Sequence, residues 1–202
     1  MPNIGESSPF IIGESNLQPW KVLKSEDLFV ANPWIALSVH QVRLPDDRVV
    51  DDYYQIELPE FAMIYARTSD DKVIVERMYK HGLRKVVLTL PAGLLESGEQ
   101  PLMSAQRELL EETGYRADEW RGLGSFVING NYGCGKAHLF EAIGAHQVAE
   151  PHSGDLEQME IVLMKPHELV DALGRGYIET LGAAALIALA TNPAINDGAA
   201  LA

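Results

Sequence analysis

The chain has 202 residues, 47% of them hydrophobic, which is enough for one sizeable domain or for a domain with a small extra lobe. Its 29 acidic and 16 basic residues give a formal net charge of −13, which disfavours bulk electrostatic binding to nucleic acid or an anionic membrane. An anionic ligand would need a local source of positive charge, and a divalent cation is the simplest one.

Cysteine usage and apolar segments predict a soluble, cytoplasmic protein. Cys134 is the single cysteine, so neither an intrachain disulfide nor a thiolate zinc cluster can form. Residues 1–16 lack the basic and apolar regions of a signal peptide and are rich in Gly, Ser and Pro. The longest apolar run, 181–190, is about half a membrane span and predicts a buried helix.

The first half of the chain has the composition of β-strands. From residue 34 a segment rich in β-branched and aromatic residues runs to Pro45-Asp46-Asp47 and resumes after this turn, which predicts a hairpin. A second pair is expected about the polar turn at 69–71. The predicted strands cover 34–44, 49–58, 61–68, 71–79 and 86–93.

The second half of the chain contains predicted helices. The segment 99–113 places Leu102, Ala105 and Leu109 on one face, with Pro101 suited to its first turn and Gly114 to its C-cap. The further expected elements are strands over 124–128, 138–145 and 159–164 and helices over 166–176 and 178–190. This order favours an α+β fold, layered as an α/β/α sandwich.

Three carboxylates crowd the end of the first predicted helix. Glu108, Glu111 and Glu112 stand at i, i+3 and i+4, so they share a face and repel one another by roughly 0.2–0.5 kcal/mol per pair. They also lie near the helix C-terminus, where the helix dipole disfavours anions. Arg107 can offset part of this by pairing with Glu111. The alternatives are a solvated acidic face and a site for a hard divalent cation.

The spacing around these glutamates resembles a known motif. It contains, in order, Gly93, five residues, Glu99, seven residues, Arg107-Glu108-Leu109, one residue, Glu111-Glu112, one residue and Gly114-Tyr115. This matches every fixed position of the Nudix hydrolase signature, G-x5-E-x7-R-E-U-x-E-E-x-G-U, in which U is apolar or aromatic. From 34 to 190 the chain is similar to the ADP-ribose pyrophosphatase branch, which also hydrolyses other nucleoside diphosphate sugars.

The resemblance implies a mixed β-sheet between helices and a metal-dependent reaction. Water attacks a phosphorus of a nucleoside diphosphate sugar with the help of Mg²⁺ or Mn²⁺, releasing a nucleoside monophosphate and a sugar phosphate. Arg107 would pair with Glu99 and hold the loop and helix together, and Gly93 would allow a sharp turn. The implied metal ligands are the backbone carbonyl of Ala92 and the carboxylates of Glu108, Glu111, Glu112 and Glu157.

The general base and the substrate contacts are expected outside the signature. The resemblance places the base at Asp155, in an acidic loop that also carries Glu157. Glu160, at an outward strand position, is an alternative base. The other interpretation is an exposed acidic loop without function. Candidate substrate contacts are Lys80, Arg84 and Tyr132. The proline typical of ADP-ribose-preferring members is missing from 130–135, so the substrate is left open.

The same resemblance implies domain boundaries and a partner for the chain. We expect an irregular arm over 1–17, an N-terminal β lobe over 18–60 that forms a homodimer, a Nudix domain over 61–192 and a tail over 193–202. The alternatives are a non-catalytic module that senses a nucleotide sugar and an isomerase acting on a diphosphate. An isomerase would need a catalytic cysteine, and Cys134 lies in a glycine-rich loop that does not favour this.

Overall fold

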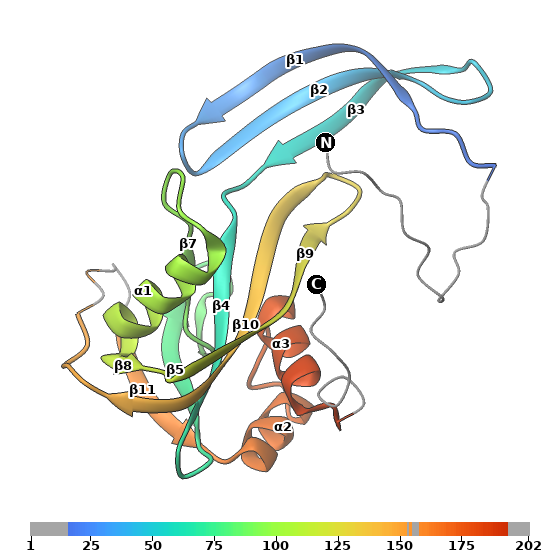
Figure 1. The fold of residues 1–202 in the computed structure, drawn as a ribbon. Coiled ribbons are helices and arrows are strands. Elements are labelled where there is room, and N and C mark those ends of the chain that lie inside the picture. The colour runs from blue at the N-terminus through green and yellow to red at the C-terminus, as the bar shows by residue number, and fades with distance from the viewer. Residues whose placement is uncertain (1–15, 153, 155–157, 194–202) are drawn as a thin grey trace.

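The structure is a computed structural model that describes residues 16–152, 154 and 158–193, and it contains two sheets and three helices in this part of the chain (Figure 1). The first sheet is formed by β1 (Lys21–Ala31), β2 (Ile35–Arg43) and β3 (Val49–Glu57). The second contains β4 (Phe61–Thr68), β5 (Val73–Lys80), β6 (Lys85–Thr89), β7 (Ala92–Leu94), β8 (Tyr115–Arg116), β9 (Glu119–Asn129), β10 (Cys134–Gln147) and β11 (Met159–Met164). The helices are α1 (Pro101–Thr113), α2 (Pro166–Gly174) and α3 (Leu181–Thr191).

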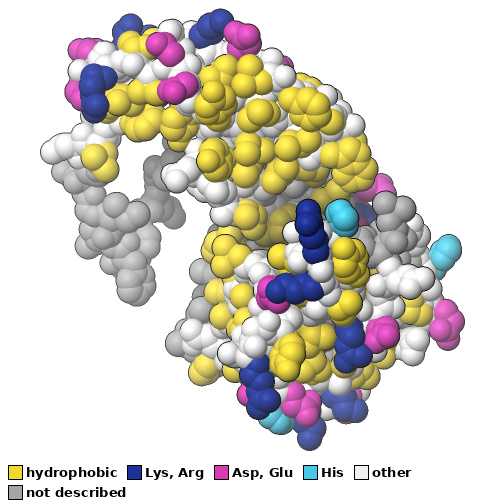
Figure 2. All heavy atoms as spheres, turned by 180° about the vertical axis from the view of Figure 1, so that it is seen from behind, with side chains coloured by type: hydrophobic (Ala, Val, Ile, Leu, Met, Phe, Trp, Pro, Cys, Tyr) yellow, Lys and Arg dark blue, Asp and Glu magenta, His cyan; other side chains and the backbone are white. Residues whose placement is uncertain are grey.

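The N-terminal sheet is an antiparallel meander that forms a separate lobe (Figure 1). Its strand β3 contacts the β9–β10 turn, where the Tyr53 hydroxyl donates to the Asn131 carbonyl at 2.8 Å. The predicted hairpin about 45–47 is present as β2 and β3. Val42 is the one fully buried residue of the central strand β2. Figure 2 shows hydrophobic side chains gathered over this lobe. The exposed ones include Val22, Phe29, Val30, Trp34, Val49 and Tyr54.

The second sheet is mixed, as the sequence predicted. Its strands run in the order β11-β5-β4-β10-β8, with β6 on β5, β7 on β4 and β9 on β10. The β4–β10 pair is parallel and the other pairs are antiparallel. Because β4, β5 and β10 are central, they carry the most buried side chains and define both faces of the core.

Alternation along β4 divides the core into two layers. Ala62, Ile64 and Ala66 pack toward α1, whereas Met63 and Tyr65 pack toward α2 and α3. The sheet is therefore sandwiched between one helix and two others, which confirms the predicted α/β/α layering (Figure 1).

Helix α1 ends as predicted but begins later. Gly114 takes the left-handed conformation (φ 75°) and its N–H donates to the Leu110 carbonyl at 2.8 Å. The helix starts at Pro101, not at Glu99, because a residue before proline is restricted to extended backbone, and Gln100 has φ −79° and ψ 142°. Glu99 thus lies in the loop that precedes the helix.

One predicted strand is divided in two, and one short strand was not predicted. The strand expected over 86–93 ends at Thr89 as β6 and resumes after Pro91 as β7, which pairs with β4, and the unpredicted β8 pairs with the end of β10. Neither is long enough to show an alternating pattern, so only the pairing reveals it. Across the described residues, no helix has the length and apolar character needed to cross a membrane. The expected domain boundaries and the cytoplasmic location stay predictions.

Candidate active site

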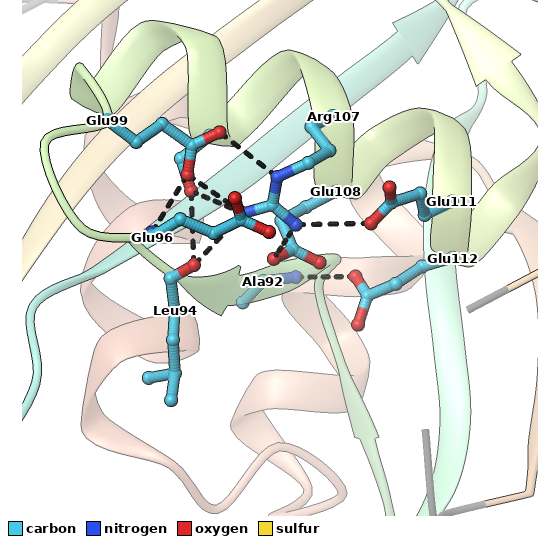
Figure 3. Close-up of polar contacts among 9 residues, drawn as sticks. Ala92, Leu94, Glu96, Glu99, Arg107, Glu108, Glu111 and Glu112 are labelled. Atoms are coloured by element: carbon cyan, nitrogen blue, oxygen red, sulfur yellow. Dashed lines mark hydrogen bonds and ion pairs between the residues drawn. The ribbon is translucent and has the colours of Figure 1, made fainter. Parts of the chain in front are cut away.

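The signature folds into a strand, a loop and a helix in which β7 lies against α1 (Figure 3). Gly93 of β7 pairs with Ala62 of β4 and faces the Glu108 side chain. A Cβ atom at Gly93 would lie 1.9 Å from Glu108 Cδ, so only glycine leaves room for this carboxylate. The glycine is therefore needed for close approach.

Two of the three helix carboxylates are buried against β7. Glu108 is 9% exposed and Glu112 is 4% exposed, and their spacing of one turn directs both side chains to the same side. The Ala92 N–H donates to Glu112 Oε2 at 2.8 Å, which holds this carboxylate at the strand (Figure 3). The Glu111 side chain is 43% exposed and lies at the rim. Burial of charged oxygens is unfavourable unless cations or hydrogen bonds compensate.

Arg107 brings positive charge into this group of carboxylates. Its guanidinium makes a bidentate contact with Glu99, Nε to Oε1 at 3.0 Å and Nη2 to Oε2 at 2.9 Å. Nη1 contacts Glu108 Oε1 at 2.6 Å and Glu111 Oε2 at 3.1 Å, and Nη2 donates to the Leu94 carbonyl at 3.0 Å. One side chain thus joins strand, loop and helix, as Figure 3 shows.

The contact between Arg107 and Glu99 favours the charged forms of both groups. The hydrogen bonds from Arg107 lower the pKa of Glu99 to about 2, and the same contacts raise the pKa of Arg107 above its usual value. The carboxylates of Glu99, Glu108, Glu111 and Glu112 outnumber this single guanidinium, so the group carries an excess of negative charge. A second cation would neutralise this excess.

The donor types present at the signature suit a divalent cation. They offer hard oxygen donors, which Mg²⁺ and Mn²⁺ prefer, and Gly93 leaves space at the strand for the Glu108 carboxylate. Glu108 and Glu112 are hydrogen-bonded to Arg107 and to the Ala92 N–H. Within residues 16–152, 154 and 158–193, no three Asp, Glu, His or Cys side chains converge closely enough to enclose a metal ion. Asp155 and Glu157 lie outside the described residues.

Of the candidate substrate contacts, Lys80 lies in a cavity beside the signature. The cavity has a volume of about 520 Å³ and also reaches Ala92 of β7. Its walls are mainly apolar and come from the lobe, β4, β9 and the start of α3, and they include Trp34, Phe61, Met63, Leu94, Ile128 and Leu181. No local pattern pointed to these wall residues, because they converge from distant segments of the chain. A larger cavity of about 780 Å³ lies at α2 and holds none of the predicted residues.

Three other candidates lie elsewhere. Arg84 is exposed in the β5–β6 turn, and Tyr132 is exposed in the β9–β10 turn, where its carbonyl accepts the Ile56 N–H at 3.4 Å. Neither lines the cavity that holds Lys80. Glu160 is exposed on β11 and pairs with Arg77 at 2.9 Å.

Comparison with known proteins agrees with this geometry. The sequence profile of the NUDIX domain matches residues 59–181, which is more than half of the chain. The chain belongs to the Nudix family. It is therefore a Nudix pyrophosphohydrolase, and the lobe before the domain matches the nucleoside diphosphate sugar hydrolase N-terminal domain over residues 20–56.

Relatives of this Nudix protein include enzymes of the predicted branch. It is 30% identical to the methanol dehydrogenase activator of Bacillus methanolicus, over 76% of this chain and 80% of the relative. It is 29% identical to the ADP-ribose pyrophosphatase of Bacillus subtilis (strain 168), over 75% and 83%. The crystal structure of an ADP compounds hydrolase has the same fold, with a TM-score of 0.74 at 19% identity, covering 86% of this chain and 93% of that one.

Gly93→Ala should inactivate this Nudix enzyme without unfolding it. The new methyl group would displace the Glu108 carboxylate, and the far end of a flexible side chain can move aside at little cost in stability. We expect an activity loss of at least about 100-fold. Circular dichroism melting and pyrophosphate hydrolysis measure the two effects.

Gly82→Ala is the matched control, since the added methyl group would meet no heavy atom within 4 Å and the φ of Gly82 is not positive. Full activity in Gly93→Ala would show that Glu108 is not needed where the structure places it.

Proposed function

We propose that this protein hydrolyses the pyrophosphate bond of a nucleoside diphosphate sugar, releasing a nucleoside monophosphate and a sugar phosphate. The observation that carries the proposal is the pair of buried carboxylates, Glu108 and Glu112, held against β7 with a net negative charge around them. A buried anionic site of this kind is stabilised by a cation, and the cation in turn attracts phosphate.

The metal, Mg²⁺ or Mn²⁺, would be held by the carboxylates of Glu108, Glu111, Glu112 and Glu157 and by the Ala92 carbonyl. When bound, it supplies positive charge that polarises the diphosphate and lowers the pKa of water. Arg107 keeps the carboxylates in place through its contacts with Glu99, Glu108 and Glu111. Asp155 would accept the proton of the attacking water.

The cavity beside Ala92 is suited to the organic part of the substrate. Lys80 at its wall can contact a phosphate oxygen, and Trp34 and Phe61 can pack against a nucleobase. The apolar walls favour a flat aromatic group over a sugar, whose hydroxyl groups need polar partners. Arg84 and Tyr132 stay candidates for contacts farther from this cavity.

The substrate class rests on two further findings. The N-terminal lobe matches a domain of nucleoside diphosphate sugar hydrolases, and relatives include ADP-ribose pyrophosphatases. ADP-ribose, GDP-mannose and UDP-glucose therefore form the first panel. A sensing module that binds such a compound without cleaving it is the alternative, and turnover separates the two.

Release of monophosphate from this panel should require a divalent cation and Glu112. With Mg²⁺ or Mn²⁺ we expect turnover of at least one compound, and with chelator none. Glu112→Gln keeps the shape of the side chain but removes a charge, and its rate should fall at least about 100-fold. The control is Glu119→Gln at an exposed position of β9. Absence of turnover over a wide panel would favour the sensing module.

Asp155→Asn tests the general base. If Asp155 accepts the proton from water, kcat should fall at least about 100-fold, whereas KM should change little. Glu119→Gln, at an exposed position of β9, serves as the control. A loss of less than about tenfold in Asp155→Asn would transfer the role to Glu157 or Glu160.

We also propose that the N-terminal lobe joins two copies of this chain. A three-stranded sheet that no helix of the described chain covers has little stability alone, and this one exposes many large apolar residues. Phe29, 56% exposed on β1, belongs to this surface.

Phe29→Asp should therefore convert a dimer to a monomer, measured by size-exclusion chromatography with light scattering. Val86→Asp, at an exposed apolar position on β6, should leave the dimer intact. A monomeric wild-type protein would contradict the proposal.

A further inference from the structure

A polar chain of three side chains crosses the sheet outside the signature. Ser125 of β9 and His138 of β10 are cross-strand partners, with 2.7 Å between Ser125 Oγ and His138 Nδ1. On the other side of the ring, His138 Nε2 lies 2.6 Å from Oε2 of Glu60, the residue before β4. A hydroxyl, an imidazole and a carboxylate are therefore connected in this order.

The carboxylate determines which ring nitrogen carries the proton. The hydrogen bond from His138 is the main cause that lowers the pKa of Glu60, and Lys136 at 3.7 Å acts in the same direction. An ionised carboxylate can only accept, so Nε2 carries the hydrogen in the neutral ring and Nδ1 has a free lone pair. The Ser125 hydroxyl consequently donates to Nδ1.

The three connected side chains differ in burial, as a nucleophile and its base require. His138 is 6% exposed, whereas Ser125 is exposed. The ring is thus shielded from water, whereas the residue that carries the hydroxyl lies at the surface. Two residues before Ser125, Leu123 forms a bulge with no partner on β10, and a bulge interrupts the backbone ladder and leaves polar groups of the strand available.

The cluster is separate from the Nudix carboxylates. His138 pairs with Ala62 of β4, and Ala62 pairs with Gly93 of β7, so the three lie in one row across the sheet. Two strand spacings, about 10 Å, separate the backbone of His138 from that of Gly93. No residue of the signature belongs to the chain from Ser125 to Glu60.

We propose that Ser125 is the nucleophile of a second hydrolytic site, with His138 as its base and Glu60 orienting the ring, and that this site takes activated carboxylic esters. Side chains in hydrogen-bond reach, with the base held by a third group, are the arrangement that activates a serine. Ser125 Oγ bonds to the ester carbonyl carbon as its proton passes to His138 Nδ1.

The proton then leaves with the alcohol as the ester C–O bond breaks. Water next attacks the acyl group, giving up a proton to Nδ1, and the acid departs as the proton returns to Ser125. The sum is ester plus water to acid plus alcohol, with no oxidant, reductant or metal.

The protein contains a second serine–histidine pair that serves as a comparison. Ser38 Oγ lies 3.3 Å from His40 Nε2 on β2, but no carboxylate hydrogen-bonds to His40 in the described part of the protein. Ser38 therefore has the hydroxyl and the imidazole without the group that would fix the ring. Its hydroxyl should be unreactive.

The test uses a fluorophosphonate probe and p-nitrophenyl acetate on the full-length protein in chelator, so that Nudix hydrolysis is silent. We expect the probe on Ser125, located by mass spectrometry, and ester hydrolysis that falls at least about 100-fold in Ser125→Ala. Ser38→Ala should behave as wild type. In Mg²⁺, Ser125→Ala should keep its pyrophosphate hydrolysis, so the two activities succeed or fail independently.

Glu60→Gln tests whether the reactivity of Ser125 depends on the carboxylate of Glu60 or only on the exposure of Ser125. An amide can donate to Nε2, which shifts the ring proton to Nδ1 and prevents it from accepting the serine proton. We expect labelling and esterase rates in Glu60→Gln to fall about as far as in Ser125→Ala, with the melting curve of the wild type as the check on folding. Any of three results would overturn the proposal. The probe could label Glu60→Gln as strongly as the wild type, or label Ser38 as strongly as Ser125. Labelling of the wild type could also be no stronger than that of Ser125→Ala.

Discussion

The fork of hydrogen bonds from Arg107 is the interaction on which the site depends. Its guanidinium contacts a loop carboxylate, two helix carboxylates and a strand carbonyl, so three segments are held by one planar group. A lysine has no such fork and could not make the bidentate contact with Glu99 and reach the other partners together. The single arginine faces four carboxylates, and this imbalance is the basis on which we propose a metal ion at the site.

The position of β7 connects the two sides of the sheet. Its Ala92 N–H donates to Glu112 of α1, while the same residue borders the cavity that holds Lys80. The carboxylates and the cavity therefore meet at one short strand. In the proposed reaction the diphosphate lies at the carboxylates and the base in the cavity, to whose wall the lobe contributes Trp34.

The lobe and the main domain differ in how far their sheets are covered by other elements. The main sheet is covered by helices on both faces and buries its central strands fully, whereas the lobe exposes apolar residues on a sheet of three strands (Figure 2). Burial of such a surface lowers the free energy by about 25 cal/mol per Å², which favours association. This contrast is the physical basis on which we propose that the lobe serves in assembly.

The reaction class and the Nudix fold were predicted through the resemblance of the signature to a known family, whereas local patterns by themselves predicted the cap of α1 at Gly114. Helical spacing places Glu108 and Glu112 on one side, and proline and glycine mark turns, wherever the rest of the chain lies. The late start of α1, the break between β6 and β7 and the short strand β8 were missed, because proline restricts its neighbour and short strand pairs show no period.

Only the tertiary structure placed Lys80 in the cavity, left Arg84 and Tyr132 outside it, and brought Glu60 to His138 across 78 residues. Strand register decides these contacts, and it arises from pairing between distant segments that no local spacing records.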